Sequence, residues 1–249
     1  YELVNHLGFD FSINNRNYSG NVLGQLLRTP EVSYCQNKQR VNFQIVKMYH
    51  LLSGFYKYLF QLDEYYVLIL GLDNAGKSTY LEAAKTHFTK NYKALNPNKI
   101  TSTVGLNIGV IETDGCSLNF WDLGGQEELQ SLWDKYYAES HAVIYVVDAF
   151  ARDRIEESKA VFDKMIASEL LKGIPLLVLA NKQDLQDSMG VREVKPIFNQ
   201  NAHLIGQRDC MVMPISALNG DGVDEGIKWL VQCIKRNSVV RPPRNQSDN

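Results

Sequence analysis

The chain of 249 residues is long enough to bury one sizeable core or two small ones. Its formal net charge of −2 and its 22% charged residues exclude the strongly basic surface of a typical nucleic-acid-binding protein, so we expect no nucleic-acid partner. Four widely scattered cysteines show neither metal-ligand spacing nor the framework of a small disulfide-rich domain, which favours a reducing compartment.

The N-terminal part differs from the remainder of the chain. Residues 1–47 lack regular apolar spacing, and the first methionine of the sequence is Met48. We expect 1–47 to be an extension upstream of the working start at Met48. On a helical wheel of 48–60 the large apolar and aromatic side chains gather on one face, which predicts an amphipathic helix over 48–62. Such a helix either makes reversible contact with a membrane or stays docked on the neighbouring domain.

Residues 63–238 alternate short apolar runs with helical patterns. This alternation predicts an α/β domain with a mostly parallel six-stranded sheet, helices on both faces and a ligand site at the carboxyl ends of the strands. We expect a flexible tail over 239–249. Strands are expected over 65–71, twice within 105–125 around the turn Asp114-Gly115, and over 141–149, 174–182 and 209–217; helices are expected over 77–92, 151–171, 190–200 and 222–236.

The segment GLDNAGKS, residues 71–78, follows the first apolar run and opens the first helical pattern. In that context it predicts a phosphate-binding loop, because backbone N–H groups and the helix N-terminus form a concave anion site. Lys77 would reach the β- and γ-phosphates, and Ser78 would ligate Mg²⁺. The alternative is a turn whose glycines serve packing alone. The expected phosphate contacts are Gly71, Asp73, Asn74, Ala75, Gly76, Lys77, Ser78 and Thr79.

The segment NKQD, residues 181–184, ends another apolar run and predicts which nucleotide base is bound. Asp184 can accept from both N1–H and N2–H₂ of guanine, and adenine has no donor in those places, so discrimination should be steep. Asn181 would brace the loop, and the stem of Lys182 would lie over the base. In the segment SAL, the N–H of Ala217 could donate to guanine O6; Ser216, Ala217 and Leu218 complete the expected base contacts.

Two further segments are expected to sense the γ-phosphate. In WDLGGQ, residues 121–126, Asp122 would hold Mg²⁺ through water, the N–H of Gly125 would contact the γ-phosphate, and Gln126 would orient the attacking water. In TSTVG, residues 101–105, Thr103 would complete the Mg²⁺ coordination when GTP is bound, or would be a capping threonine. The expected metal ligands are therefore Ser78, Thr103 and Asp122.

These motifs resemble the Arf/Arl branch of the Ras-like small GTPases through GLDNAGKS, TVGLN, FWDLGGQE, LWDKYY and LANKQD, and the likeness covers about 48–245. The resemblance implies the P-loop small GTPase fold, with GTP or GDP and Mg²⁺ as ligands. It implies a switch in Golgi-associated membrane trafficking, cytoplasmic and peripheral on Golgi membranes. Its implied partners are a guanine-nucleotide exchange factor, a GTPase-activating protein and effectors.

The chain departs from the family pattern in two places. Arf proteins carry a glycine after the initiator for myristoylation, whereas Met48 is followed by Tyr49. Without that lipid the helix should bind membranes weakly, so we expect a protein receptor on the membrane. The family also reads the nucleotide state with an aromatic triad. Trp121 and Tyr136 match it, but the first position is Leu106, so the choice of effector is expected to differ.

The expected catalytic residues are Gln126 and Lys77. Asp73 occupies a loop position near the γ-phosphate, where its size and charge should hinder the catalytic geometry, and no arginine is evident in the switch segments. We therefore expect slow intrinsic hydrolysis, accelerated by a partner that supplies an arginine. One alternative is a guanine-nucleotide-binding scaffold with negligible hydrolysis. Another is a different P-loop class such as a small-molecule kinase, against which NKQD argues.

Overall fold

The computed structural model describes Met48, Leu51, Leu52 and residues 62–244. The chain divides into two compact units, Tyr1–Gln61 and Leu62–Asn249, and the account below concerns the second. The predicted extension over 1–47 lies outside the described residues, as does the amphipathic helix over 48–62 apart from Met48, Leu51, Leu52 and Leu62. Among the helices that the structure describes, none is long and apolar enough to cross a membrane.

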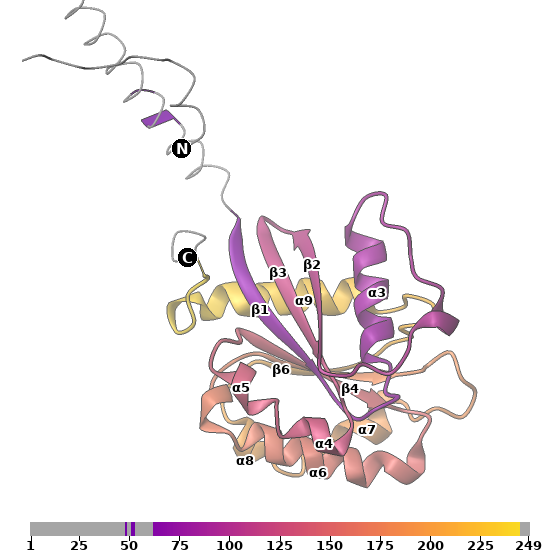
Figure 1. The fold of residues 1–249 in the computed structure, drawn as a ribbon. Helices are drawn as coiled ribbons and strands as arrows, with labels where there is room; N and C mark the ends of the chain where they lie inside the picture. The colour runs from indigo at the N-terminus through magenta and orange to yellow at the C-terminus, as the bar shows by residue number, and fades with distance from the viewer. Residues whose placement is uncertain (1–47, 49–50, 53–61, 245–249) are drawn as a thin grey trace, which may run out of the picture. The chain divides into compact units, whose positions relative to one another are not determined.

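Six strands form one sheet in the order β2-β3-β1-β4-β5-β6, with β2 antiparallel to β3 and all other neighbours parallel (Figure 1). The predicted α/β fold with a mostly parallel six-stranded sheet is confirmed. The apolar runs form the strands because a sheet covered on both faces buries every side chain of its central strands. The strands are β1 (Asp63–Leu70), β2 (Leu106–Thr113), β3 (Cys116–Leu123), β4 (Ala142–Asp148), β5 (Leu176–Asn181) and β6 (Cys210–Pro214).

The hairpin between β2 and β3 turns where the sequence predicts it. Thr113 pairs with Cys116, which leaves Asp114 and Gly115 as the two turn residues. Both have positive φ, 49° for Asp114 and 73° for Gly115, as the tight turn that matches the strand twist requires. The hairpin register places Asn107 opposite Asp122.

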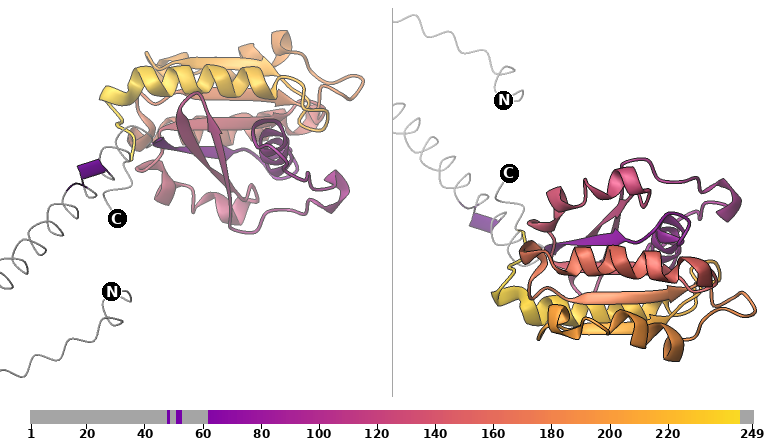
Figure 2. Two further views of the ribbon diagram at one scale, coloured as in Figure 1. Left: turned by 90° about the horizontal axis from the view of Figure 1, so that it is seen from above. Right: turned by 90° about the horizontal axis from the view of Figure 1, so that it is seen from below.

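Helices cover both faces of the sheet (Figures 1 and 2). Two helical predictions were too long: the first helix ends at Phe88, where Thr89 turns extended, and the pattern over 151–171 is broken because Ser168 is extended. The helices are α3 (Lys77–Phe88), η1 (Pro97–Lys99), α4 (Glu127–Gln130), α5 (Asp134–Tyr137), η2 (Arg152–Arg154), α6 (Ile155–Ile166), η3 (Glu169–Leu171), α7 (Val191–Phe198), α8 (Ala202–Ile205), α9 (Val223–Arg236) and η4 (Asn237–Val239).

Two apolar cores lie on the two faces of the sheet. Because side chains alternate along β1, Val67 enters the core shared with α3 and α9, whereas Leu68 enters the core shared with α6 and α7. Both side chains are fully buried. This packing fixes the carboxyl ends of β1, β3, β4 and β5 at one edge, where the polar loops emerge.

Residues 241–244, within the tail predicted over 239–249, make hydrogen bonds to the domain. Arg241 donates to the carbonyl of Ala138 at 2.6 Å, and the backbone N–H of Arg244 donates to the carbonyl of Glu64 at 2.9 Å. The ring of His141 bonds the carbonyl of Pro242 at 3.0 Å. Residues 241–244 are therefore bound to the domain, because their guanidinium and backbone groups satisfy carbonyls that strand and helix leave free.

Candidate functional site

The loop 71–78 joins β1 to α3 in a conformation that depends on glycine at two positions. Gly71 has a φ of 139°, and a Cβ on it would stand 2.2 Å from the carbonyl oxygen of Val146. Gly76 has a φ of 93°, and a Cβ there would stand 2.3 Å from Nδ2 of Asn181. The loop is thus pressed against the ends of β4 and β5, and its turn delivers the first N–H groups of α3 to a cavity.

Lys77 lies buried at the start of α3, and its ammonium group points back across the loop. Its Nζ donates to the carbonyls of Gly71 at 3.0 Å and Leu72 at 2.7 Å. Burial lowers the pKa of Lys77 to about 8, against the opposing charges of Asp122 and Asp73. A phosphate that entered this cavity would supply the negative charge that the buried ammonium lacks.

The three predicted metal ligands lie close to one another near Lys77. The hydroxyl of Ser78 donates to Oδ2 of Asp122 at 2.6 Å and lies 2.7 Å from the hydroxyl of Thr103. Asp122 is 0% exposed, and its Oδ1 has no hydrogen-bond partner among the described residues. Burial raises the pKa of the Asp122 carboxyl, while the bond from Ser78 opposes that shift.

This cluster fits a Mg²⁺ ion on the chemistry of its donors. A buried carboxylate oxygen without a partner, next to two hydroxyls, offers the oxygen ligands that Mg²⁺ prefers. The described residues contain no group of three or more His, Cys, Asp or Glu side chains that could hold a metal ion. A site with one carboxylate suits Mg²⁺ in particular, because this ion keeps several waters and takes phosphate oxygens as further ligands.

The segment 124–126 packs against the phosphate-binding loop. A Cβ on Gly125 would stand 2.4 Å from the carbonyl oxygen of Gly71 and 2.4 Å from Nζ of Lys77, so glycine alone fits here. The N–H of Gly124 donates to the carbonyl of Gly105 at 3.0 Å, which links this segment to the one that carries Thr103. The side chain of Gln126 is exposed, and among the described residues it makes only a long contact of 3.5 Å to the hydroxyl of Ser102.

Asn181 connects the phosphate-binding loop to the segment SAL. Its Nδ2 donates to the carbonyl of Ala75 at 2.8 Å, and its Oδ1 accepts from the N–H of Ala217 at 2.9 Å. Asp184 is exposed beside it, and its Oδ1 accepts a 2.6 Å bond from the buried hydroxyl of Ser216. The segments NKQD and SAL therefore lie side by side next to the phosphate-binding loop.

Two cavities are lined by part of the predicted residues. The first, of about 220 Å³, is the phosphate side, and the second, of about 500 Å³, lies between α3, the loop before Thr101 and the SAL segment. Thr79 lines both. Neither cavity is lined by the other predicted residues, which are Gly71, Ala75, Asp122, Gln126, Asn181, Lys182, Asp184 and Ser216. The first cavity is lined by Asp73, Asn74, Gly76, Lys77, Ser78, Thr79, Ile100, Thr101, Ser102, Thr103 and Gly125; the second includes Thr79, Ala217 and Leu218.

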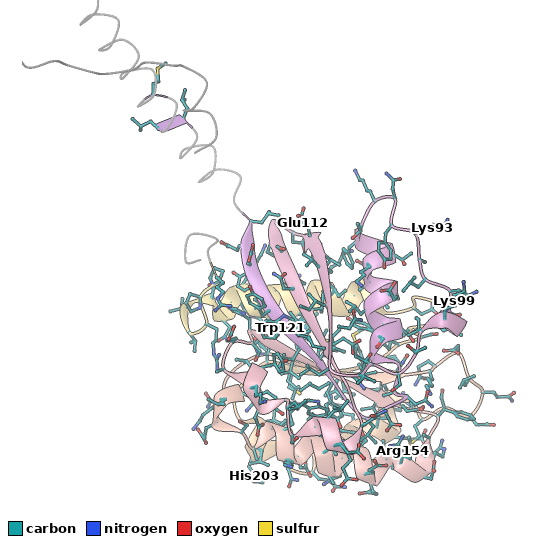
Figure 3. The ribbon with its side chains drawn as sticks, viewed as in Figure 1. Lys93, Lys99, Glu112, Trp121, Arg154 and His203 are labelled. Atoms are coloured by element: carbon teal, nitrogen blue, oxygen red, sulfur yellow. The ribbon has the colours of Figure 1, made fainter. Side chains whose placement is uncertain are left out.

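Sequence reasoning missed three polar residues at this site. Asp148, at the end of β4, accepts a 2.6 Å bond from Nζ of Lys182, and its place after an apolar strand could have revealed it. Asn107 donates to Oδ2 of Asp122 at 3.3 Å from the opposite strand of the hairpin. Arg154, the last residue of η2 and labelled in Figure 3, binds Asp73, and no pattern in the sequence signals that contact.

The aromatic pair that matches the family triad gains a partner from β1. The rings of Trp121 and Tyr136 meet edge to face with centroids 5.3 Å apart, and the ring of Tyr66 lies 4.7 Å from that of Trp121. Leu106 pairs with Leu123 in the hairpin, so it does not stand opposite Trp121. Trp121 thus has aromatic neighbours in Tyr66 and Tyr136.

Comparison with known proteins agrees with the site. A model of the ADP-ribosylation factor family matches residues 52–234. ADP-ribosylation factor-related protein 1 of Bos taurus is 60% identical over 199 residues, which cover 80% of this chain and 98% of the relative. The human protein of that name is 58% identical over the same share. ADP-ribosylation factor-like protein 3 of Saccharomyces cerevisiae is 45% identical over 197 residues, covering 79% of this chain and 98% of the relative.

A solved structure is similar across the whole domain. The Arl6 BBS3 small GTPase from Trypanosoma brucei, with bound nucleotide analogue GppNp, superposes with a TM-score of 0.60 and 30% sequence identity. The match covers 70% of this chain and 98% of that one. The predicted resemblance is confirmed. The chain belongs to the ADP-ribosylation factor family of small GTPases, proteins that bind guanine nucleotides and hydrolyse GTP.

Proposed function

We propose that this protein is a GTP/GDP-regulated switch in Golgi-associated membrane trafficking. The observation that supports this proposal is the contact of two separate segments with the phosphate-binding loop. The hydroxyl of Thr103 lies 2.7 Å from that of Ser78, and Gly125 packs against Gly71 and Lys77. Both segments meet the loop where a γ-phosphate would lie, so loss of that phosphate on hydrolysis releases them.

The residues of the site divide into three roles. Lys77 and the loop amides neutralise phosphate charge, Gly125 contacts the γ-phosphate, and Gln126 orients the attacking water. Ser78, Thr103 and Asp122 would hold Mg²⁺, which when bound neutralises charge on the phosphate oxygens. Asn181, Lys182 and Asp184 with Ser216, Ala217 and Leu218 select guanine; the bond from Ser216 holds the Asp184 carboxylate in place for this task.

Intrinsic hydrolysis is proposed to be slow and to depend on an activating protein. The exposed side chain of Gln126 makes only one long contact within the described part of the chain, so in the free protein it is not held in a catalytic position. The arginine nearest the phosphate-binding loop, Arg154, is occupied by two carboxylates. Single-turnover GTP hydrolysis, with and without an activating protein of the family, tests this point. No hydrolysis in either case would favour the alternative, a guanine-nucleotide-binding scaffold.

Membrane contact is proposed to run through the segment 48–62 together with a protein receptor on Golgi membranes. The support is the amphipathic pattern of the sequence and the absence of glycine after Met48. Exchange factor, activating protein and effectors are the remaining partners, as in small GTPases generally. The test is flotation of protein beginning at Met48 on pure liposomes and on Golgi membranes. We expect weak binding to lipid and GTP-dependent binding to Golgi membranes, and equal binding in both nucleotide states would contradict the switch.

A further inference from the structure

Arg154 contacts the phosphate-binding loop at Asp73, which lies 81 residues earlier in the sequence. Its Nη2 donates to Oδ1 of Asp73 at 2.8 Å, and its Nη1 lies 3.4 Å from the carbonyl oxygen of the same residue. Glu157, in the first turn of α6, accepts from Nε at 2.9 Å and from Nη2 at 2.9 Å. Glu157 therefore holds the guanidinium so that its Nη1 and Nη2 face Asp73.

Asp73 places a negative charge at the rim of an anion-binding cavity. It lines the cavity of about 220 Å³ together with Lys77, Thr103 and Gly125. Gly125 touches the neighbouring residue Leu72, so Asp73 stands at the end of the loop where the terminal phosphate of a triphosphate would be recognised. A carboxylate at this place repels a triphosphate more than a diphosphate, because the triphosphate carries the additional charged group.

The charges of both residues extend to the cavity. Asp73 lines the cavity directly, and Nη2 of Arg154 lies 2.8 Å from the carboxylate of Asp73. Arg154 thus acts on the same space as Asp73 with the opposite sign. Its bond to the loop carbonyl of Asp73 also fixes the loop backbone at this point.

We propose that Arg154 is a positioning residue of the phosphate site, which holds and neutralises Asp73 and thereby sets the affinity for GTP relative to GDP. This inference rests on the proposed function of the site. Without Arg154 the Asp73 carboxylate turns freely towards the cavity, and GTP is disfavoured more than GDP. Since the side chains of the pair are 34% and 42% exposed, water screens the effect, and we expect a change of about three- to five-fold.

The same short helix offers a matched control. Arg152 is also an arginine of η2, but its Nη1 pairs with Glu193 at 2.8 Å and its Nη2 lies 3.5 Å from the carbonyl oxygen of Asp187. It makes no bond to the phosphate-binding loop among the contacts of the described residues. Arg152→Ala removes a guanidinium of equal charge two positions away, so it controls for net charge and for the stability of η2.

The experiment is a double-mutant cycle read by competition binding of GDP and a non-hydrolysable GTP analogue at fixed Mg²⁺. Arg154→Ala should lower the affinity ratio of the GTP analogue to GDP by about three- to five-fold, and Arg152→Ala should leave it unchanged. Arg154→Lys should restore most of the ratio because it keeps the charge. In an Asp73→Asn background, Arg154→Ala should have no further effect. Thermal melting of every variant with GDP bound verifies that each is folded.

Two outcomes would overturn the inference: an unchanged ratio in folded Arg154→Ala, or an equal loss in the presence and absence of the Asp73 carboxylate. In 0.5 M salt the effect of Arg154→Ala should shrink, and a salt-independent loss would likewise count against a charge effect. Failure of the unsubstituted protein to bind either nucleotide would overturn the proposed function as well, so the two failures are distinguishable.

Discussion

The side-chain amide of Asn181 donates to the carbonyl of Ala75, 106 residues earlier in the chain, at 2.8 Å. Its oxygen accepts from the N–H of Ala217 at 2.9 Å. Asn181 is 2% exposed, so water cannot replace either bond. One buried side chain thus ties the phosphate-binding loop to both segments expected to hold the base, and the geometry of the site depends on it.

Asn181→Ala should therefore destabilise the fold as well as the site. Removal of the amide leaves the carbonyl of Ala75 and the N–H of Ala217 buried without partners, at a cost of roughly 2–4 kcal/mol in the free energy of unfolding. Urea denaturation measures this loss. Gln207→Ala, the truncation of an exposed amide, is the control and should change the stability by less than about 0.5 kcal/mol. Equal stabilities of the two variants would contradict the bridging role.

Asp184→Asn should weaken GTP binding by about two to four powers of ten, because charge-assisted bonds to guanine are lost. It should also shift the preference towards xanthine nucleotides, whose C2 carbonyl can accept from the new amide. Competition binding of GTP and XTP measures both effects. Asp187→Asn changes an exposed carboxylate of the same loop and should leave both affinities unchanged. Tight GTP binding by Asp184→Asn would show that NKQD takes no part in base recognition.

The sequence was sufficient for the sheet and for the loops at its edge. Buried strands appear as continuous apolar runs, and the motifs at their ends are local, so β1 with the loop 71–78 and β5 with Asn181 could be placed by short-range patterns. The turn Asp114-Gly115 has a local signal of the same kind. The segment 1–61, almost wholly outside the described residues, stays a prediction.

Contacts that depend on tertiary placement could not be predicted. Arg154 meets Asp73 across 81 residues because α6 happens to begin beside the phosphate-binding loop. Residues 241–244 bind the domain through guanidinium and backbone groups that bond to carbonyls, and such bonds leave no periodic pattern in the sequence. Composition alone predicts a tail for a stretch that contains Pro and Arg at the end of a chain, whether or not the stretch packs against the domain.

Gln126→Leu and Ser78→Asn should separate hydrolysis from binding. The exposed side chain of Gln126 makes only one long contact to the residues that the structure describes, so its replacement should keep nucleotide affinity and remove activator-stimulated hydrolysis. Ser78→Asn loses the 2.6 Å bond to Asp122 and the hydroxyl that is proposed to ligate Mg²⁺, so it should weaken Mg²⁺ and GTP binding and favour GDP. Nucleotide content after purification and single-turnover hydrolysis distinguish them. Ser131→Asn, at an exposed serine, is the control, and identical loss of nucleotide in both variants would mean that the roles are wrongly assigned.

His141 should make the stability of the domain depend on pH through the attachment of residues 241–244. The N–H of Tyr66 donates to its Nδ1 at 2.9 Å, so the neutral ring carries its proton on Nε2 and donates it to the carbonyl of Pro242 at 3.0 Å. Burial lowers the pKa of His141 below its ordinary 6.5, and the nearby charges of Arg241 and Arg244 lower it further, against the bond to the Pro242 carbonyl, which favours the protonated ring.

In the unfolded chain His141 takes up its proton near pH 6.5, whereas in the folded protein it does so only at a lower pH. The unfolded state therefore binds more protons in the window just below pH 6.5, and this residue's contribution to stability falls as the pH falls through it, by at most about 1.4 kcal/mol per pH unit. Urea denaturation between pH 7.5 and 5.5 should show a shallower slope for His141→Gln than for the parent. His203→Gln, at an exposed histidine, should retain the parent slope. Parallel slopes for the parent and His141→Gln would show that a histidine elsewhere in the chain, or a carboxylate, governs the acid response.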